Sequence, residues 1–290
     1  MSLDILFAIL GSLRVRQWAK NVFVLAPLVF AHQLFGDRVA AALVMALGFC
    51  LASSAVYLFN DLRDRHLDRL HPVKRLRPIA AGRLRPAAAA GAIVTLAAAA
   101  LVLAFVSGGV PGLGFLAAYL ALNTAYSWRL KAVAYLDVAC IAAGFLLRVF
   151  AGAAAVEVPV SVWIQVNTLL LAAFLGFGKR FHELSWVDDG HSALRPALGG
   201  YRRRTLDALL LVFQVLIPLA FLAYTLDPVS ARHHRLIFTV PLLTFALYRF
   251  HRLSAEPGGW HSPTDRMLHD PWFLAAAGGW TAATLWLLYG

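Results

Sequence analysis

The sequence predicts an all-α, polytopic membrane protein in which nine transmembrane helices surround a central cavity open to the cytoplasmic side. Of its 290 residues, 60% are hydrophobic and only 14% are charged, and the mean hydropathy is +0.70. Soluble globular domains typically carry about 25% charged residues. The composition therefore excludes a soluble domain, and we expect a single transmembrane domain over residues 1–290.

Long uncharged runs give the positions of the crossings. Four runs are each about long enough to span ~30 Å of hydrocarbon as a helix: residues 39–59, 158–178, 208–226 and 271–290. The uncharged residues 86–128 contain a cluster of Gly and Pro between 107 and 112, which favours two helices joined by a tight turn. Three further segments bring the predicted number of crossings to nine: 17–36, 132–155 and 234–249.

Basic residues indicate the orientation. Five segments on one side of the predicted membrane hold 22 of the 26 Lys and Arg residues. Because Lys and Arg concentrate in cytoplasmic loops, we expect a multi-pass protein of the plasma (inner) membrane, with its N-terminus and its charged loops in the cytoplasm. The net charge of +11 follows from this orientation. Nucleic-acid binding is disfavoured, because the charge lies in short loops without a nucleic-acid motif.

Two features are expected to be structural. Residues 1–13 are apolar but lack a basic start and a small-residue cleavage site, so the sequence favours a short interfacial helix over a signal peptide. Cys50 and Cys140 lie far apart in predicted helices and match no metal or disulfide spacing. We expect both cysteines to be packing residues.

An acidic motif follows the run 39–59. Asn60, Asp64 and Asp68 are spaced at i, i+4 and i+8, so on a helix they fall within an arc of roughly 80°, spread over about 12 Å. Neighbouring carboxylates repel each other unless a cation lies among them, and oxygen ligands of this kind suit Mg²⁺. The motif therefore predicts a magnesium site, and magnesium in turn suggests a substrate that carries phosphate.

Basic residues come directly after this motif. Five of them lie between positions 74 and 85: Lys74, Arg75, Arg77, Arg83 and Arg85. They can hold phosphate oxygens that the metal leaves free, the arginines through two-pronged hydrogen bonds. The alternative is a solvated loop of mixed charge, which joins many membrane helices. The helical spacing headed by Asn60 favours the site, and we interpret the stretch as a metal-diphosphate site at a membrane surface.

Four other polar residues have two interpretations each. Lys20 and Asn21 open the first crossing, where they either anchor the helix at the interface or line the site. Asp137 and Arg148 are ionisable groups inside one predicted helix, about three turns apart and too distant to pair directly. Each of these two either pairs with a polar group on a neighbouring helix or has a catalytic role.

A second charged loop follows the run 158–178. Lys179, Arg180 and Glu183 are predicted on the same cytoplasmic side as the first motif. An uncharged helix followed by acidic and basic residues thus occurs twice. This suggests a pseudo-repeat of residues 17–155 and 158–290 around one shared cavity.

These residues resemble a known family, the UbiA-type intramembrane prenyltransferases. The resemblance rests on Asn60-xxx-Asp64-xxx-Asp68 after the second helix, Tyr126-Ser127-xxx-Lys131 after the fourth and an acidic loop after the sixth. Within that family, five runs resemble the branch of decaprenyl-phosphate phosphoribosyltransferases: 16–21, 57–61, 71–82, 144–148 and 179–184.

The resemblance implies that 5-phosphoribosyl 1-diphosphate gives its phosphoribosyl group to decaprenyl (polyprenyl) phosphate in a Mg²⁺-dependent reaction that releases diphosphate. The product would serve decaprenyl-phosphate-arabinose and cell-wall arabinan synthesis. Spacing and resemblance together give the expected site. The catalytic residues are Asp64, Asp68, Lys131 and Arg148, and the metal ligands are Asn60, Asp64 and Asp68. The substrate-binding residues are Lys20, Asn21, Asp61, Lys74, Arg75, Arg77, Tyr126, Lys179, Arg180 and Glu183.

One departure from the family pattern bears on the choice of substrate. Ordinary members carry a second Asp-xxx-Asp motif after the sixth helix, where this sequence has Lys179, Arg180 and Glu183. The exchange replaces negatively charged side chains by positively charged ones, as expected if this loop binds additional phosphate groups. The alternatives are a prenyltransferase acting from a prenyl diphosphate on an aromatic acceptor, and a transporter or other non-enzyme. The number of metal ions and the oligomeric state, including a homo-oligomer, stay open.

Overall fold

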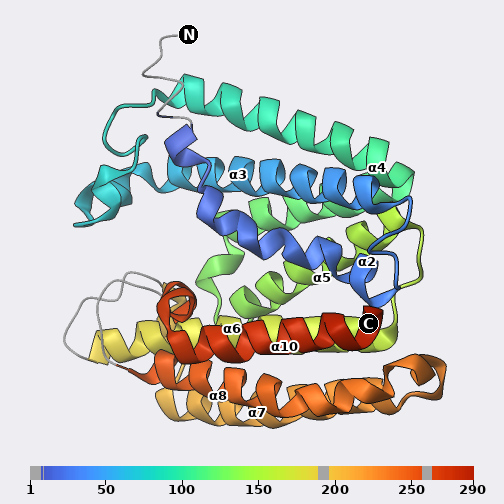
Figure 1. Cartoon of the computed structure of the whole chain (residues 1–290). Helices are drawn as coiled ribbons and strands as arrows, with labels where there is room; N and C mark the ends of the chain where they lie inside the picture. Colours follow the sequence, from blue (N-terminus) through green and yellow to red (C-terminus); the bar gives the residue numbers. More distant parts are fainter. Residues whose placement is uncertain (1–7, 9, 189–195, 257–262) are drawn as a thin grey trace. The chain divides into compact units, whose positions relative to one another are not determined.

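Every regular element of the described chain is helical, which confirms the predicted all-α class over those residues. The computed structural model describes residues 8, 10–188, 196–256 and 263–290 (Figure 1). The chain divides into two compact units. Unit 1 comprises residues 1–128 and 147–160, and unit 2 comprises residues 129–146 and 161–290.

Unit 1 is built on α3, Val39–Leu70, a continuous helix of 32 residues (Figure 1). At 1.5 Å per residue the helix is about 48 Å long, which exceeds the ~30 Å of a hydrocarbon core. It ends at His71, whose backbone is extended, because the following Pro72 disfavours a helical conformation at the residue before it. The predicted crossing and the acidic motif therefore lie on one helix.

The helix α4, Pro86–Trp128, contains the predicted turn. Gly109 has φ 59° and ψ −153°, a conformation that is open to glycine, and the chain turns back there (Figure 1). A Cβ added to Gly112 would lie 2.8 Å from the carbonyl oxygen of Ala104, although these residues would be about 12 Å apart in a straight helix. Residues 86–128 thus form two helices that pack together beside the turn.

The segment predicted as the first crossing, 17–36, differs from one continuous α-helix. The chain forms the 3₁₀ helix η1, Val15–Leu25, and then the short helix α2, Ala26–Phe30. Pro27 lies in the first turn of α2, where its missing N–H needs no partner. Residues 8 and 10–12 are helical. The other residues of the predicted interfacial helix include 1–7 and 9, which lie outside the described residues.

The remaining long helices follow in order. They are α5, Leu136–Val156, α6, Val162–Asp188, α7, Arg203–Leu226, α8, Val240–Ala255, and α10, Pro271–Tyr289. Shorter elements lie between them: η2 (Lys74–Leu76), η3 (Leu130–Ala132), η4 (Pro196–Gly200), η5 (Pro228–Thr239), α9 (Pro263–Arg266) and η6 (Met267–His269). The boundary between the units falls within α5.

Five helices of the described chain are long and apolar enough to cross a membrane, namely α3, α4, α5, α6 and α7. Their positions agree with an integral membrane protein. The broken α4 covers two of the predicted crossings. The total of nine crossings and the central cavity remain predictions.

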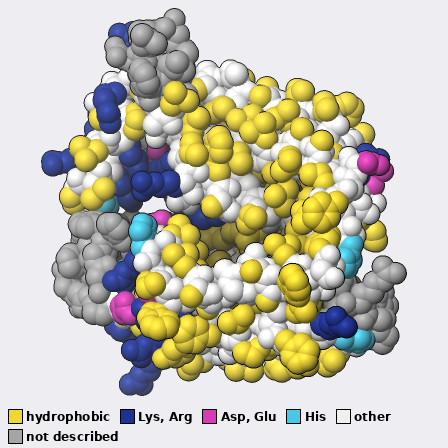
Figure 2. Space-filling model, viewed as in Figure 1, with side chains coloured by type: hydrophobic (Ala, Val, Ile, Leu, Met, Phe, Trp, Pro, Cys, Tyr) yellow, Lys and Arg dark blue, Asp and Glu magenta, His cyan; other side chains and the backbone are white. Residues whose placement is uncertain are grey.

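Each unit has its own apolar core. In unit 1, Met45, Phe49, Leu116 and Tyr119 pack with small residues of α4 and α5. In unit 2 the core is rich in aromatic side chains from α6 and α8, among them Phe174 and Phe250. Figure 2 shows that Lys and Arg side chains of unit 1 gather around the end of α3 and the loop after it. The rest of the surface of unit 1 in this view is mainly hydrophobic.

A close backbone contact fixes η1 against the unit 1 part of α5. A Cβ added to Gly152 would lie 1.8 Å from the carbonyl oxygen of Val24, and a real side chain cannot approach a backbone atom that closely. Glycine at position 152 is therefore what allows η1 to pack here.

We expect Gly152→Ala to displace η1 and to lower the free energy of unfolding by about 1–3 kcal/mol, a typical cost of overpacking. Thermal unfolding of the purified protein in detergent measures this effect. Gly91→Ala is the matched control, because a Cβ added to Gly91 meets nothing within 4 Å. Equal melting temperatures for both variants would contradict the close packing of η1.

Candidate active site

The motif at the end of α3 lies on one helical face, as its spacing predicts. Asn60, Asp64 and Asp68 all fall within the helix. Asp68 is buried, whereas Asn60 and Asp64 are partly exposed. The axial distance from Asn60 to Asp68 is about 12 Å, so one Mg²⁺ ion with ligands at about 2.1 Å cannot bind both residues directly.

Asp61, next to the motif, is held by two arginines. Its carboxylate is buried, and its Oδ1 accepts from Arg14 Nη2 at 2.5 Å and from Arg77 Nη1 at 3.1 Å. The guanidinium of Arg14 also lies 4.8 Å from the centre of the Tyr57 ring. Arg14 has a left-handed backbone, with φ 52°, which is uncommon and costly for a residue other than glycine. The ion pair and the ring contact offset this cost.

Arg77 joins the motif to the loop that follows α3. Its Nη1 donates to Asp68 Oδ2 at 2.7 Å in addition to its bond with Asp61. One guanidinium thus compensates two buried carboxylates on α3, which would be costly to bury without a cation. Of the other predicted phosphate ligands, Arg75 is exposed and Lys74 is partly exposed.

The loop 71–85 owes its fold to local bonds. Nδ1 of His71 accepts from the backbone N–H groups of Val73 at 3.2 Å and Lys74 at 3.3 Å. Burial, together with the charge of Lys74, lowers the pKa of His71, so the ring stays a neutral acceptor near pH 7. Ile79 and Leu84 pack on Leu58 of α3. These contacts hold Lys74 and Arg77 beside the motif.

The motif fits Mg²⁺ only together with a substrate. Over the described residues, no group of three or more His, Cys, Asp and Glu side chains is arranged to hold a metal by itself. Asp64 lies one turn from both Asn60 and Asp68, so two oxygen ligands are available at a time. Mg²⁺ usually binds one or two carboxylates and takes its other ligands from water and substrate phosphates. The donor set therefore suits a magnesium–phosphate complex.

Arg148 and Asn21, which lie 127 residues apart in the sequence, are in contact in unit 1. Arg148 Nε donates to Asn21 Oδ1 at 2.8 Å, and its Nη2 donates to the Tyr119 hydroxyl at 3.0 Å. The guanidinium lies 4.5 Å from the centre of the Tyr119 ring. Asn21 also donates to Cys50 Sγ at 3.2 Å. Arg148 thus links η1, α4 and α5, as the pairing alternative for this residue predicts.

Asp137 has its partners in unit 2. Its Oδ2 accepts from Arg180 Nε at 2.6 Å, and its Oδ1 accepts from the Tyr201 hydroxyl at 2.5 Å. Arg180 Nη1 donates to Glu183 Oε2 at 2.5 Å. Burial and the bond to Asp137 raise the pKa of Tyr201, so this hydroxyl stays a donor. Arg180 is only 1% exposed, and a phosphate could reach it only if this network opened.

The other predicted site residues are partly exposed. Lys20 lies in η1, Tyr126 in the last turn of α4, Lys131 in η3 and Lys179 in α6. Arg14 and Tyr201 were not among the predicted site residues. Arg14 could have been noticed as a cation just before the polar pair at 20–21, whereas no local pattern singles out Tyr201, whose partner lies 64 residues away.

Comparison with known proteins gives matches over most of the chain. Residues 21–258 match the model of the UbiA prenyltransferase family. The chain is 35% identical to the decaprenyl-phosphate phosphoribosyltransferase of Mycolicibacterium smegmatis over 68% of this chain and 64% of that protein. It is 37% identical to the enzyme of the same name from Corynebacterium glutamicum over 66% of this chain and 58% of that protein. The chain thus spans about three fifths of the length of these relatives.

A solved structure has a similar fold. It is a UbiA homolog from Archaeoglobus fulgidus bound to DMAPP and Mg²⁺, with a TM-score of 0.70, covering 97% of this chain and 98% of that one. The sequence identity is 18%, so the likeness concerns the fold.

Asp137→Asn is expected to lower the free energy of unfolding by about 3 kcal/mol, because Arg180 then loses a buried counter-charge. Thermal unfolding measures the effect, and Asp207→Asn is the control, since Asp207 is half exposed in its pair with His251. Replacing both partners, as in Asp137→Leu with Arg180→Met, should recover much of the loss. A double variant less stable than Asp137→Asn would count against this interpretation.

Proposed function

Because the chain belongs to the UbiA prenyltransferase family, we propose that it transfers the phosphoribosyl group of 5-phosphoribosyl 1-diphosphate to decaprenyl (polyprenyl) phosphate and releases diphosphate. The observation that carries the proposal is the 35% and 37% identity with two decaprenyl-phosphate phosphoribosyltransferases. The site supports it, because oxygen ligands on α3 lie beside the cations of the loop 71–85. A magnesium–diphosphate complex needs both kinds of group. The product would feed decaprenyl-phosphate-arabinose and cell-wall arabinan synthesis.

The donor diphosphate is proposed to bind at the end of α3. Asp64 would hold Mg²⁺ together with Asn60 on one side and with Asp68 on the other, and bound Mg²⁺ neutralises the charge that develops on the leaving diphosphate. Lys74, Arg75 and Arg77 would donate hydrogen bonds to its free oxygens. Arg77 is suited to this role, since a guanidinium has five N–H donors and its bonds to the described side chains of Asp61 and Asp68 both come from Nη1.

The transfer exchanges one C–O bond for another at C1 of the sugar. The bond from C1 to the diphosphate oxygen breaks and its electron pair leaves with diphosphate, while an oxygen of the lipid phosphate forms the new bond to C1. The sugar is oxocarbenium-like on the way. Because the lipid phosphate is already anionic near neutral pH, positioning matters more than removal of a proton. Lys20, Tyr126 and Lys131 are proposed to position the substrates.

Buried residues are proposed to act through their neighbours. Arg148 would fix η1 through Asn21, and η1 carries Lys20. In unit 2, Lys179 is proposed to bind a substrate phosphate directly. Arg180 would set the position of Lys179 and Glu183 on α6 through its buried bond to Asp137.

The experiment that tests the function is a transfer assay with purified protein, Mg²⁺, 5-phosphoribosyl 1-diphosphate and a polyprenyl phosphate. Mass spectrometry of the lipid fraction should detect a polyprenyl phosphate that has gained one phosphoribosyl group. The proposal fails if the lipid is unchanged while the same preparation transfers a prenyl group from a prenyl diphosphate to an aromatic acceptor.

In this assay, Asp64→Asn and Asp68→Asn should each lower turnover by about a hundredfold or more, which corresponds to roughly 3 kcal/mol of transition-state stabilisation. Asp37→Asn is the control, because Asp37 is exposed before the start of α3. Near wild-type turnover of either motif variant at saturating Mg²⁺ would show that the ligand assignment is wrong.

The basic loops are proposed to face the cytoplasm of a plasma-membrane protein with nine crossings, because 22 of the 26 Lys and Arg residues lie on one predicted side. Ala81→Cys, in a protein with Cys50 and Cys140 replaced by Ser, should react with a membrane-impermeant maleimide in inverted vesicles. Labelling of the same cysteine in intact cells would reverse the topology.

A further inference from the structure

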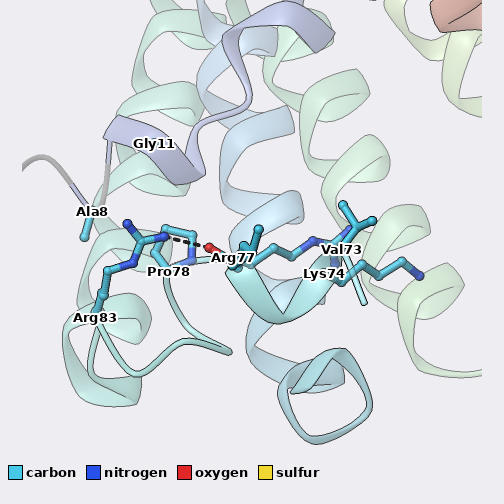
Figure 3. A pocket seen from close by; sticks show the side chains of 8 residues that line it. Ala8, Gly11, Val73, Lys74, Arg77, Pro78 and Arg83 are labelled. Atoms are coloured by element: carbon cyan, nitrogen blue, oxygen red, sulfur yellow. Dashed lines mark hydrogen bonds between the residues drawn. The ribbon is translucent and has the colours of Figure 1, made fainter. Parts of the chain in front are cut away.

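A pocket of about 880 Å³ lies in unit 1 between the N-terminal segment and the loop after α3. Ala8 and Gly11 line it on one side, and residues of the loop between 73 and 83 line it on the other (Figure 3). Its volume falls within the range of about 300–1,000 Å³ that is typical of sites for small ligands. Lys74 and Arg77, which the proposed function assigns to the donor diphosphate, form one wall of this pocket, and Arg83 on the same loop has no assigned ligand.

The charged part of the lining consists of cations. Lys74, Arg77 and Arg83 line the pocket, and no Asp or Glu is among its described lining residues. Arg83 Nη2 donates to the backbone oxygen of Leu76 at 2.6 Å, which holds the guanidinium at the wall of the pocket (Figure 3). Arg83 forms no ion pair with any described residue. Its remaining N–H groups therefore suit an incoming anion, above all a phosphate.

The rest of the lining is apolar. Val73 and Leu76 line the pocket and are 51% and 65% exposed. Leu67 and Leu70, in the last turn of α3, are exposed as well. Exposed apolar side chains beside cations at the end of a membrane helix are the surface expected to meet a lipid that carries negative charge.

Arg77 connects the pocket to the acidic motif. It lines the pocket, and its Nη1 also donates to Asp61 and Asp68. A phosphate in the pocket could therefore contact Arg77, the same side chain that donates to Asp68, which is one of the proposed Mg²⁺ ligands.

We propose that this pocket binds the phosphate head and the first isoprene units of the acceptor lipid, an inference that rests on the proposed function. The donor has a sugar and three phosphates but no apolar chain to cover Val73 and Leu76. A polyprenyl phosphate combines one phosphate, which matches Arg83, with an apolar chain that matches the rest of the lining. The acceptor thus enters beside the loop 71–85, and Arg77 lies between the two substrates.

Steady-state kinetics with the full-length protein in nanodiscs tests this assignment. Arg83→Gln should raise KM for the polyprenyl phosphate about tenfold, the effect of losing one charge-assisted hydrogen bond, and should leave KM for 5-phosphoribosyl 1-diphosphate within about twofold. Arg129→Gln is the control, since Arg129 is an exposed arginine that does not line the pocket and has no assigned role in the site. An increase in KM for the donor and not for the lipid would assign the pocket to the donor and overturn the proposal.

A second variant fills the pocket without removing charge. Gly11 lines the pocket, and a Cβ added to it meets nothing within 4 Å, so Gly11→Phe is the variant chosen to place a ring there. Its KM for the lipid should rise by at least the same factor, whereas Gly91→Phe, also at an open glycine, should match the wild type. Unchanged lipid KM values for Gly11→Phe and Arg83→Gln would rule the pocket out.

Direct binding separates this inference from the proposed function. In native mass spectrometry, the wild-type protein should retain geranylgeranyl phosphate, and Arg83→Gln should lose it, while retention of phosphatidylglycerol should be the same for both. If Arg83→Gln lost both lipids equally, the pocket would be a general phospholipid site and the proposal would be wrong. This measurement stays decisive even if the wild-type protein fails to transfer phosphoribosyl, because it does not depend on turnover.

Discussion

The hydrogen bonds from Arg77 to Asp61 and Asp68 are the interaction on which the site in unit 1 depends. Two buried carboxylates at the end of a membrane helix need a cation, and a residue of the following loop supplies it. The same bonds draw the loop 71–85 back onto α3, where His71 and the packing of Ile79 and Leu84 fix its course. The bonds that neutralise Asp61 and Asp68 therefore also position the loop 71–85. The position of this loop in turn forms one wall of the pocket.

The same constraint explains the ionisable groups deeper in each unit. Arg148 is buried in unit 1, where the amide of Asn21 and the hydroxyl of Tyr119 accept its hydrogen bonds. Asp137 is buried in unit 2, where Arg180 and Tyr201 donate to it. These groups tie together segments far apart in the sequence, and the free energy of leaving either one uncompensated makes each arrangement specific.

Sequence patterns correctly predicted the features that depend on neighbouring residues alone. The i, i+4, i+8 spacing placed Asn60, Asp64 and Asp68 on one helix, and the Gly and Pro cluster located the break at Gly109. The segment 17–36 was predicted as one crossing but forms η1 and α2, because apolar composition does not distinguish a 3₁₀ helix from an α-helix. The packing of η1 against Gly152 was also beyond local patterns, since the two segments are far apart in the sequence. Likewise, residues 179–183 were predicted as a loop but belong to α6, and the burial of Arg180 could not be predicted from its neighbours in sequence, because its partner Asp137 lies 43 residues away.

The central claim, that the sugar and not a phosphoryl or prenyl group moves, is tested most directly with a doubly labelled donor. The donor would carry ¹⁴C in the ribose and ³²P in the terminal phosphate of the diphosphate, and purified protein would be incubated with it, Mg²⁺ and a polyprenyl phosphate. The account predicts ¹⁴C in the lipid fraction and an equal molar amount of ³²P released as diphosphate. Lipid that carried ³²P would contradict the account, and so would diphosphate release without ¹⁴C in the lipid.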